Sequence, residues 1–77
     1  MSQVLDSFSE QEILSLQEQY IGLTEAEAFE LAEDDVRLQG FRVREVDGVG
    51  QGLTADFLPR RLNFHIENGI VISISFG

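Results

Sequence analysis

The dipeptide Asn68-Gly69 separates two alternating apolar segments and predicts a tight β-hairpin. A type I′ turn requires positive φ at both central residues, and Asn followed by Gly adopts it readily. Polar and apolar residues alternate on both sides of the turn, as expected for strands with one buried face. The strands are predicted at residues 62–66 and 70–76, with an inner face made of Leu62, Phe64, Ile66, Ile70, Ile72, Ile74 and Phe76.

Two helices are predicted from capping boxes, in which a Ser or Thr precedes a Glu by three positions. These pairs are Ser9 with Glu12 and Thr24 with Glu27. The first helix is short and ends near residue 19, and the second, main helix covers residues 25–35. Helical spacing places three residues on the inner face of the main helix and two beside it. The inner three are Ala28, Leu31 and Ala32, and the two beside them are Phe29 and Val36.

A third strand is predicted at residues 41–46, with Phe41 and Val43 facing inward. One main helix packed on a small three-stranded mixed sheet, with an extended loop and a short N-terminal helix, gives an α+β fold. Residues 1–19 are expected to form a lead-in segment with its helix, and residues 20–77 the principal domain.

The composition limits the partners of the chain. Its 77 residues are 43% hydrophobic and include no cysteine, which suits one small core without disulfides. A net charge of −9 would repel a phosphate backbone and disfavours nucleic acid. No apolar segment approaches the ~20 residues that cross a membrane. The first residues lack the features of a secretory signal, so a cytoplasmic location is expected, or a periplasmic or secreted one if a signal was removed.

His65 is the single histidine, and with Ser73 or Ser75 it supplies two parts of a nucleophilic triad. All three residues fall on the outward phase of their strands, without a buried acid or an oxyanion turn. An ordinary surface histidine is therefore expected, and an enzyme ranks third among the functions considered.

Metal and cofactor sites are not expected either. The carboxylates of residues 25–35 lack a calcium-loop pattern and have no His or Cys beside them, so they are expected to face water. The glycines at 48, 50 and 52 lack the Gly-Lys-Ser/Thr ending of a phosphate loop and are interpreted as turn formers.

The segment Leu53–Asn63 follows these glycines and contains the single proline, which favours an exposed loop. Arg61 opens the next strand, and alternation points its side chain and that of Asn63 away from the core. If the loop folds back over this face, Arg61 can donate to Asp56, to Thr54 or to loop carbonyls. The alternative is that both loop arginines are solvated charges, since exposed ion pairs contribute little.

Three blocks of sequence carry a resemblance: YIGLTEAEA at residues 20–28, VGQGLTADF at 49–57 and PRRLN at 59–63. The first is similar to Leu-Val-Gly-x-Ser/Thr-x-x-x-Ala, the entry into the helix of the potato inhibitor I family of serine protease inhibitors. The second resembles the protease-binding loop of this family, Val-Gly-x-x-Val-Thr-x-Asp/Glu-Tyr/Leu. The third resembles the Pro-Asp-Arg-Leu-Asn that follows the loop in bacterial relatives of the family. The resemblance covers residues 20–77.

The resemblance implies an inhibitor whose loop is cut, if at all, at the scissile bond Ala55–Asp56. Ala55 would enter the specificity pocket, and its small side chain suits a subtilisin-like or elastase-like protease. Arg61 and Asn63 would support the loop; Asn63 stands where plant and leech members have a second supporting arginine. The implied protease-binding residues are Gly52, Leu53, Thr54, Ala55, Asp56, Phe57 and Leu58.

A second function is a non-inhibitory interaction module on the same fold. The apolar side chains of the N-terminal helix would then contact another protein or, weakly, a second copy of the chain. The residues expected to do so are Ile13, Leu14 and Leu16.

Overall fold

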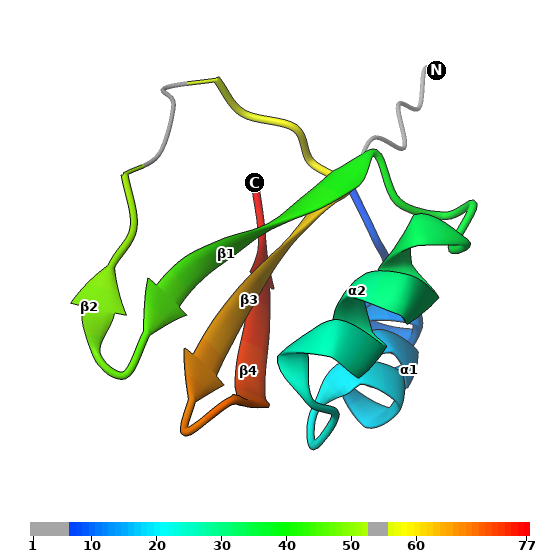
Figure 1. Ribbon diagram of the computed structural model, residues 1–77. Helices are drawn as coiled ribbons and strands as arrows, with labels where there is room; N and C mark the ends of the chain where they lie inside the picture. Colours follow the sequence, from blue (N-terminus) through cyan, green and yellow to red (C-terminus); the bar gives the residue numbers. More distant parts are fainter. Residues whose placement is uncertain (1–6, 53–55) are drawn as a thin grey trace, which may run out of the picture.

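The computed structural model describes residues 7–52 and 56–77, which form two helices and a four-stranded mixed sheet (Figure 1). The elements are α1 (Glu10–Tyr20), α2 (Glu25–Glu33), β1 (Gly40–Val46), β2 (Val49–Gly50), β3 (Arg61–Glu67) and β4 (Ile70–Phe76). The strand order is β2-β1-β3-β4, in which β1 and β3 are parallel and both outer pairs are antiparallel. The predicted α+β class is confirmed, but the three predicted strands omit β2.

Both predicted capping boxes are present and fix where the helices begin. At α1, Glu12 N donates to Ser9 Oγ at 3.2 Å and Ser9 N donates to Glu12 Oε1 at 2.9 Å. Thr24 and Glu27 repeat this arrangement at α2, at 3.2 and 3.0 Å. Such a cap pairs N–H groups that the helix start would leave unsatisfied, and it contributes ~1 kcal/mol.

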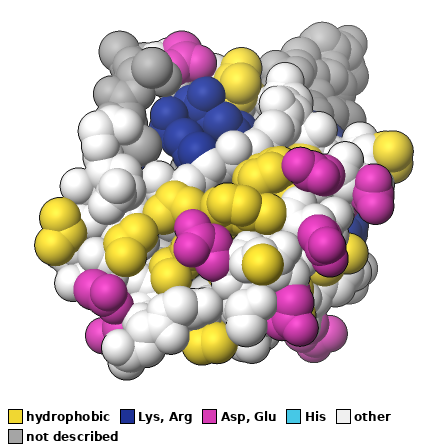
Figure 2. Space-filling view, viewed as in Figure 1, with side chains coloured by type: hydrophobic (Ala, Val, Ile, Leu, Met, Phe, Trp, Pro, Cys, Tyr) yellow, Lys and Arg dark blue, Asp and Glu magenta, His cyan; other side chains and the backbone are white. Residues whose placement is uncertain are grey.

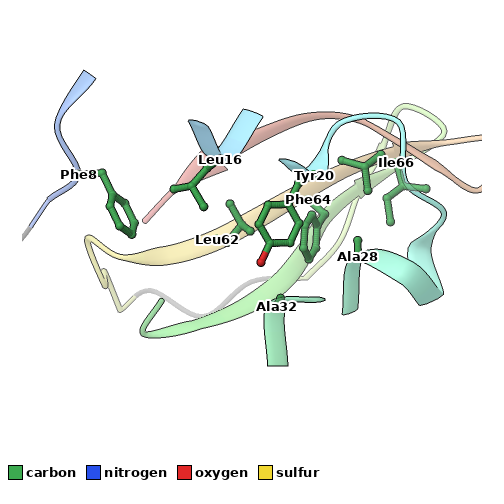
Figure 3. Close-up of a cluster of buried hydrophobic side chains, with 9 residues drawn as sticks. Phe8, Leu16, Tyr20, Ala28, Ala32, Leu62, Phe64 and Ile66 are labelled. Atoms are coloured by element: carbon green, nitrogen blue, oxygen red, sulfur yellow. The ribbon is translucent and has the colours of Figure 1, made fainter. Parts of the chain in front are cut away.

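Side chains from both helices meet those of β3 in one core (Figure 3). Leu16 and Tyr20 of α1 and Phe64 of β3 are fully buried. The ring centres of Tyr20 and Phe64 lie 5.7 Å apart, and Phe64 also contacts the rings of Phe29 and Phe41. The predicted N-terminal helix is therefore present and packs into the core as directly as α2. This core includes residues on both sides of the boundary predicted at residue 20.

Helix α2 buries a narrower face than its apolar pattern predicts. Ala28 and Ala32 are buried as predicted. Leu31 is 40% exposed, so its predicted position on the inner face is wrong, and Val36, predicted to lie beside that face, is 96% exposed. The helix ends at Glu33 rather than near residue 35, so Val36 no longer lies on a helical face.

A β-bulge changes which residues of β4 face the core. His65 pairs with Ser73, but the next pair joins Ile66 to Val71, which leaves Ile72 as an extra residue. Val71 is fully buried, whereas Ile72 is 49% exposed. The predicted inward position of Ile72 is therefore wrong, because strict alternation does not hold across an inserted residue.

Two tight turns with positive φ connect the antiparallel strands. Asn68 and Gly69 have φ angles of 53° and 78°, which confirms the predicted hairpin between β3 and β4. Asp47 and Gly48 have φ angles of 51° and 81° and connect β1 to β2. Asn68 N donates to Asp47 Oδ1 at 2.8 Å and joins the two turns. Asp-Gly is the same kind of hairpin signal as Asn-Gly, and it could have predicted β2.

A buried carboxylate fixes the chain after α2. Asp35 accepts a hydrogen bond from Tyr20 Oη at 3.0 Å and two from the Arg37 guanidinium at 2.8 and 2.6 Å. Its side chain is 6% exposed, so the expectation that the carboxylates of residues 25–35 all face water is wrong here. Hydrogen bonds from Arg37 lower the pKa of Asp35, and burial raises the pKa of the Tyr20 hydroxyl.

We expect the free energy of unfolding to decrease as the pH falls below the ordinary aspartate pKa of ~4. Because the pKa of Asp35 is lower in the folded state, its contribution is complete above that pH and is lost as the pH falls through the folded pKa. Urea unfolding at several pH values measures the effect. Asp35→Asn should flatten this acidic part of the profile, whereas Asp34→Asn, at an exposed position, should not. Equal profiles for both variants would contradict the assignment to Asp35.

Candidate functional site

Between β2 and β3, residues 51–52 lead away from the sheet and residues 56–60 return to it, and the C-terminal end of β4 lies beneath the arch to which they belong (Figure 1). The structure describes residues 51–52 and 56–60 of the segment. The predicted scissile bond is therefore described only on its Asp56 side. Three of the predicted protease-binding residues lie outside the described residues: Leu53, Thr54 and Ala55. Of the other four, Leu58 is half-buried, and the exposed ones are Gly52, Asp56 and Phe57.

Arg61 joins this loop to the sheet. It is the first residue of β3 and is only 9% exposed. Its Nη1 donates to Asp56 Oδ2 at 3.1 Å, and its Nη2 donates to the main-chain oxygen of Asp56 at 2.9 Å. The predicted contact between Arg61 and Asp56 is thus present, and the alternative of a solvated charge is wrong for Arg61.

The ion pair between Arg61 and Asp56 fixes geometry more than it stabilises the fold. The Asp56 side chain is 54% exposed, whereas that of Arg61 is 11% exposed. Water screens a pair of this kind, so its contribution is ~1 kcal/mol or less. Two hydrogen bonds from one planar guanidinium nevertheless orient both the side chain and the carbonyl group of Asp56.

The end of β4 supports the loop from below. Arg61 Nε donates to the main-chain oxygen of Gly77 at 3.0 Å, and Gly77 N donates to Arg61 O at 3.2 Å. The Phe57 ring lies so close to Gly77 that an added Cβ would stand 2.9 Å from Phe57 Cε1. Arg61 and Gly77 therefore hold the two loop residues that follow the predicted scissile bond.

We expect Gly77→Ala to displace the Phe57 ring and leave the core intact. The added methyl group would overlap the ring, and φ of 124° at this position is one that side chains rarely adopt, at a cost of ~1 kcal/mol or more. The NMR chemical shifts of the Phe57 ring measure the displacement, with Gly50→Ala as a control at a position with open space. Unchanged Phe57 shifts in Gly77→Ala would contradict the contact.

Asn63 contacts Arg42 rather than a described residue of the loop. It is 1% exposed, and its Oδ1 accepts from Arg42 Nε at 2.8 Å. Arg42 Nη2 also donates to the Gly77 oxygen at 3.3 Å, the atom that Arg61 Nε binds. The support of the loop that the resemblance implies for Asn63 is therefore not a hydrogen bond to a described loop residue. Arg42 has no local signal in the sequence, because it lies on β1 and only the parallel register with β3 places it opposite Asn63.

A second set of contacts anchors the returning half of the loop. Arg60 N donates to Gln39 Oε1 at 2.7 Å, and Gln39 N donates to Arg60 O at 2.9 Å. The Arg60 guanidinium lies 4.6 Å from the centre of the Phe8 ring, which is itself packed on Phe76 at 5.2 Å. These contacts attach the loop to the start of β1 and to the segment before α1. The alternative of a solvated charge is therefore also wrong for Arg60.

Basic side chains gather in the space that the arch spans, although the chain as a whole is acidic (Figure 2). The guanidinium groups of Arg42 and Arg61 lie close together there because they share the Gly77 oxygen. Acidic side chains are distributed over other parts of this face (Figure 2). The local positive charge attracts the carboxylate of Asp56 toward the sheet.

His65 forms hydrogen bonds on both sides of its ring. Nδ1 lies 3.1 Å from Glu45 Oε1, and Nε2 lies 3.1 Å from Ser75 Oγ. The His65 side chain is 19% exposed, so it is more enclosed than a fully exposed surface histidine. The order of carboxylate, imidazole and hydroxyl is that of a nucleophilic triad, but the described residues form no pocket that would receive a substrate. The three side chains connect β1, β3 and β4 across the sheet.

The described residues contain no group of three or more His, Cys, Asp or Glu placed to hold a metal ion. Within the same residues, no helix is long and apolar enough to cross a membrane. Comparison with protein-family models, curated proteins and solved structures finds no match to the chain. The loop and the side chains beneath it are therefore the candidate site.

Proposed function

We propose that the protein inhibits a serine protease by presenting residues 52–58 as a substrate-like loop. The sequence blocks that resemble the potato inhibitor I family support this function. The structural observation that supports it most is the attachment of Asp56, through its side chain and its carbonyl group, to the buried Arg61. A loop held in one geometry loses little conformational entropy when it enters a protease cleft.

Inhibition then depends on a hydrolysis that stalls. The protease serine attacks the carbonyl carbon of Ala55, the Ala55–Asp56 bond breaks, and the new amine of Asp56 is the leaving group. Arg61 and Gly77 hold Asp56 and Phe57, so this amine remains beside the acyl carbon. Religation of the bond then competes with attack by water, because the amine is present at a high effective concentration.

The side chain of Ala55 indicates the class of target. A methyl group fills little of a large apolar specificity pocket, so it gains little there from the burial of apolar area. A small specificity pocket, or one that tolerates several side chains, loses less binding free energy when it accepts this methyl group. The expected targets are therefore subtilisin-like or elastase-like proteases.

Titration of subtilisin, elastase and chymotrypsin with the protein tests this function. We expect the activity of subtilisin or elastase to fall in proportion to the added protein and to approach zero near equimolar amounts. Chymotrypsin should be inhibited less than subtilisin or elastase. Ala55→Phe should reverse this order, because the larger ring fills the specificity pocket of chymotrypsin. Far stronger inhibition of chymotrypsin by the parent protein would contradict the role assigned to Ala55.

An interaction module is the second candidate because α1 exposes apolar surface. Leu14 is 60% exposed, and Ile21, seven residues further along, is 41% exposed. Leu16 is fully buried and Ile13 packs against the core, so Leu14 is the one available member of the three residues predicted to dock. If the protein self-associates through this surface, sedimentation should show a dimer that Leu14→Glu abolishes. A monomer that inhibits a protease would favour the first function.

A further inference from the structure

We propose that Arg42 is a positioning residue for the loop, and that Asn63 acts by orienting Arg42. The consequence for inhibition rests on the proposed function, whereas the effect on the order of the loop does not. Arg42 and Asn63 are paired residues of the parallel strands β1 and β3. Both side chains therefore lie on the sheet face that carries Arg61.

The carboxamide of Asn63 fixes the direction of the Arg42 side chain. Its Oδ1 accepts from Arg42 Nε at 2.8 Å, and Asn63 is 1% exposed, so water cannot readily replace this bond. A bond at Nε restrains the plane of the guanidinium and therefore the positions of both terminal nitrogens. One of these nitrogens, Nη2, reaches the Gly77 oxygen at 3.3 Å. Asn63 thus acts on the end of β4 through Arg42.

Arg42 and Arg61 divide the support of the loop between them. Arg61 uses Nε, the nitrogen nearest its stem, for Gly77 and its two terminal nitrogens for Asp56. Arg42 holds the same Gly77 oxygen from the neighbouring strand. Two cations this close repel each other, and the Gly77 oxygen, which accepts from both, offsets part of that repulsion. With Arg42 in place, the terminal nitrogens of Arg61 are directed toward the loop rather than toward the sheet.

The position of Gly77 in turn determines the packing of Phe57. The Phe57 ring lies directly against Gly77, at a spacing that leaves no room for an added Cβ. Without Arg42, Gly77 would keep the bonds to Arg61 and lose the bond that attaches it to β1. Residues 56 and 57 should then sample more conformations, although Arg61 itself is unchanged.

Hydrogen exchange of the amides of Arg61 and Gly77, which donate to Leu58 O and Arg61 O, tests this role without any protease. We expect Arg42→Met to accelerate exchange at Arg61 and Gly77 by about tenfold, as the loss of a charge-assisted hydrogen bond predicts. Arg44→Met is the matched control, because Arg44 is an exposed arginine of the same strand. Arg42→Lys should restore protection only in part, since an ammonium group cannot bind Asn63 and Gly77 with the same fork.

A double variant that moves the guanidinium group from one strand to the other gives the sharpest comparison of loop protection. The double variant Arg42→Asn with Asn63→Arg moves the cation from β1 to β3 and should recover more loop protection than Arg42→Asn alone. Exchange in Arg42→Met within twofold of the parent, or equal acceleration in Arg44→Met, would overturn the proposal. If Arg42→Met does not fold, Arg42→Gln is judged by the same criteria. A parent protein that inhibits no protease would contradict the proposed function and leave the exchange result for Arg42 valid.

Discussion

Arg61→Ala is expected to convert the protein from an inhibitor into a substrate, with the loop cleaved about 100-fold faster than in the parent. The substitution removes both bonds to Asp56 and the bond from Nε to Gly77. After cleavage, the new amine of Asp56 would move away from the acyl-enzyme, and water would complete the hydrolysis. Measurement of the rate of loop cleavage and of residual protease activity tests this expectation.

The control separates loss of the loop support from loss of the fold. Arg44→Ala removes an exposed arginine from β1 and should leave inhibition unchanged. Urea unfolding should show that Arg61→Ala retains most of the stability of the parent, because the pair with half-exposed Asp56 contributes little. An inhibition constant equal to that of the parent would contradict the role of Arg61 as a support.

Phe64→Ala is expected to lower the free energy of unfolding by ~3–5 kcal/mol. Phe64 is fully buried in β3, and its ring contacts those of Tyr20, Phe29 and Phe41 at 5.7, 5.8 and 6.0 Å. Truncation therefore loses the burial of a ring and leaves a cavity between both helices and the sheet. A domain of 77 residues has a total stability of about 4–12 kcal/mol, so the variant should be close to unfolding at 37 °C.

Phe57→Ala is the matched control for this measurement. Phe57 is 69% exposed, so its truncation should change the free energy of unfolding by less than ~1 kcal/mol. Urea unfolding followed by circular dichroism gives both values. Similar losses for the two substitutions would show that the aromatic cluster around Phe64 is not the centre of the core.

Local signals in the sequence predicted the start of each helix and the final hairpin. A capping box or an Asn-Gly turn is decided by residues that lie within a few positions of each other, such as Ser9 and Glu12. The exposure of Ile72 was not predictable in the same way. It depends on a bulge whose position is set by the pairing of β4 with β3. Strict alternation cannot reveal an extra residue in one strand.

The candidate site shows the same division between local and distant contacts. The contact of Arg61 with Asp56 was predictable because both residues belong to one short segment and are five positions apart. The contribution of Arg42 depends on the parallel pairing of β1 with β3, which joins residues 21 positions apart. The resemblance implies that Asn63 supports the loop, whereas the register places Asn63 against Arg42. The burial of α1 likewise follows from tertiary packing on Phe64 rather than from its own apolar pattern.

The most direct test of inhibition follows the mass of the protein and the activity of the protease in one incubation. Excess protein is mixed with subtilisin or elastase, and samples are taken over several hours. The proposed function predicts that the protease stays inhibited while a single bond, Ala55–Asp56, is cut slowly and incompletely. Rapid cleavage of residues 52–58 at several bonds, with full protease activity throughout, would contradict it.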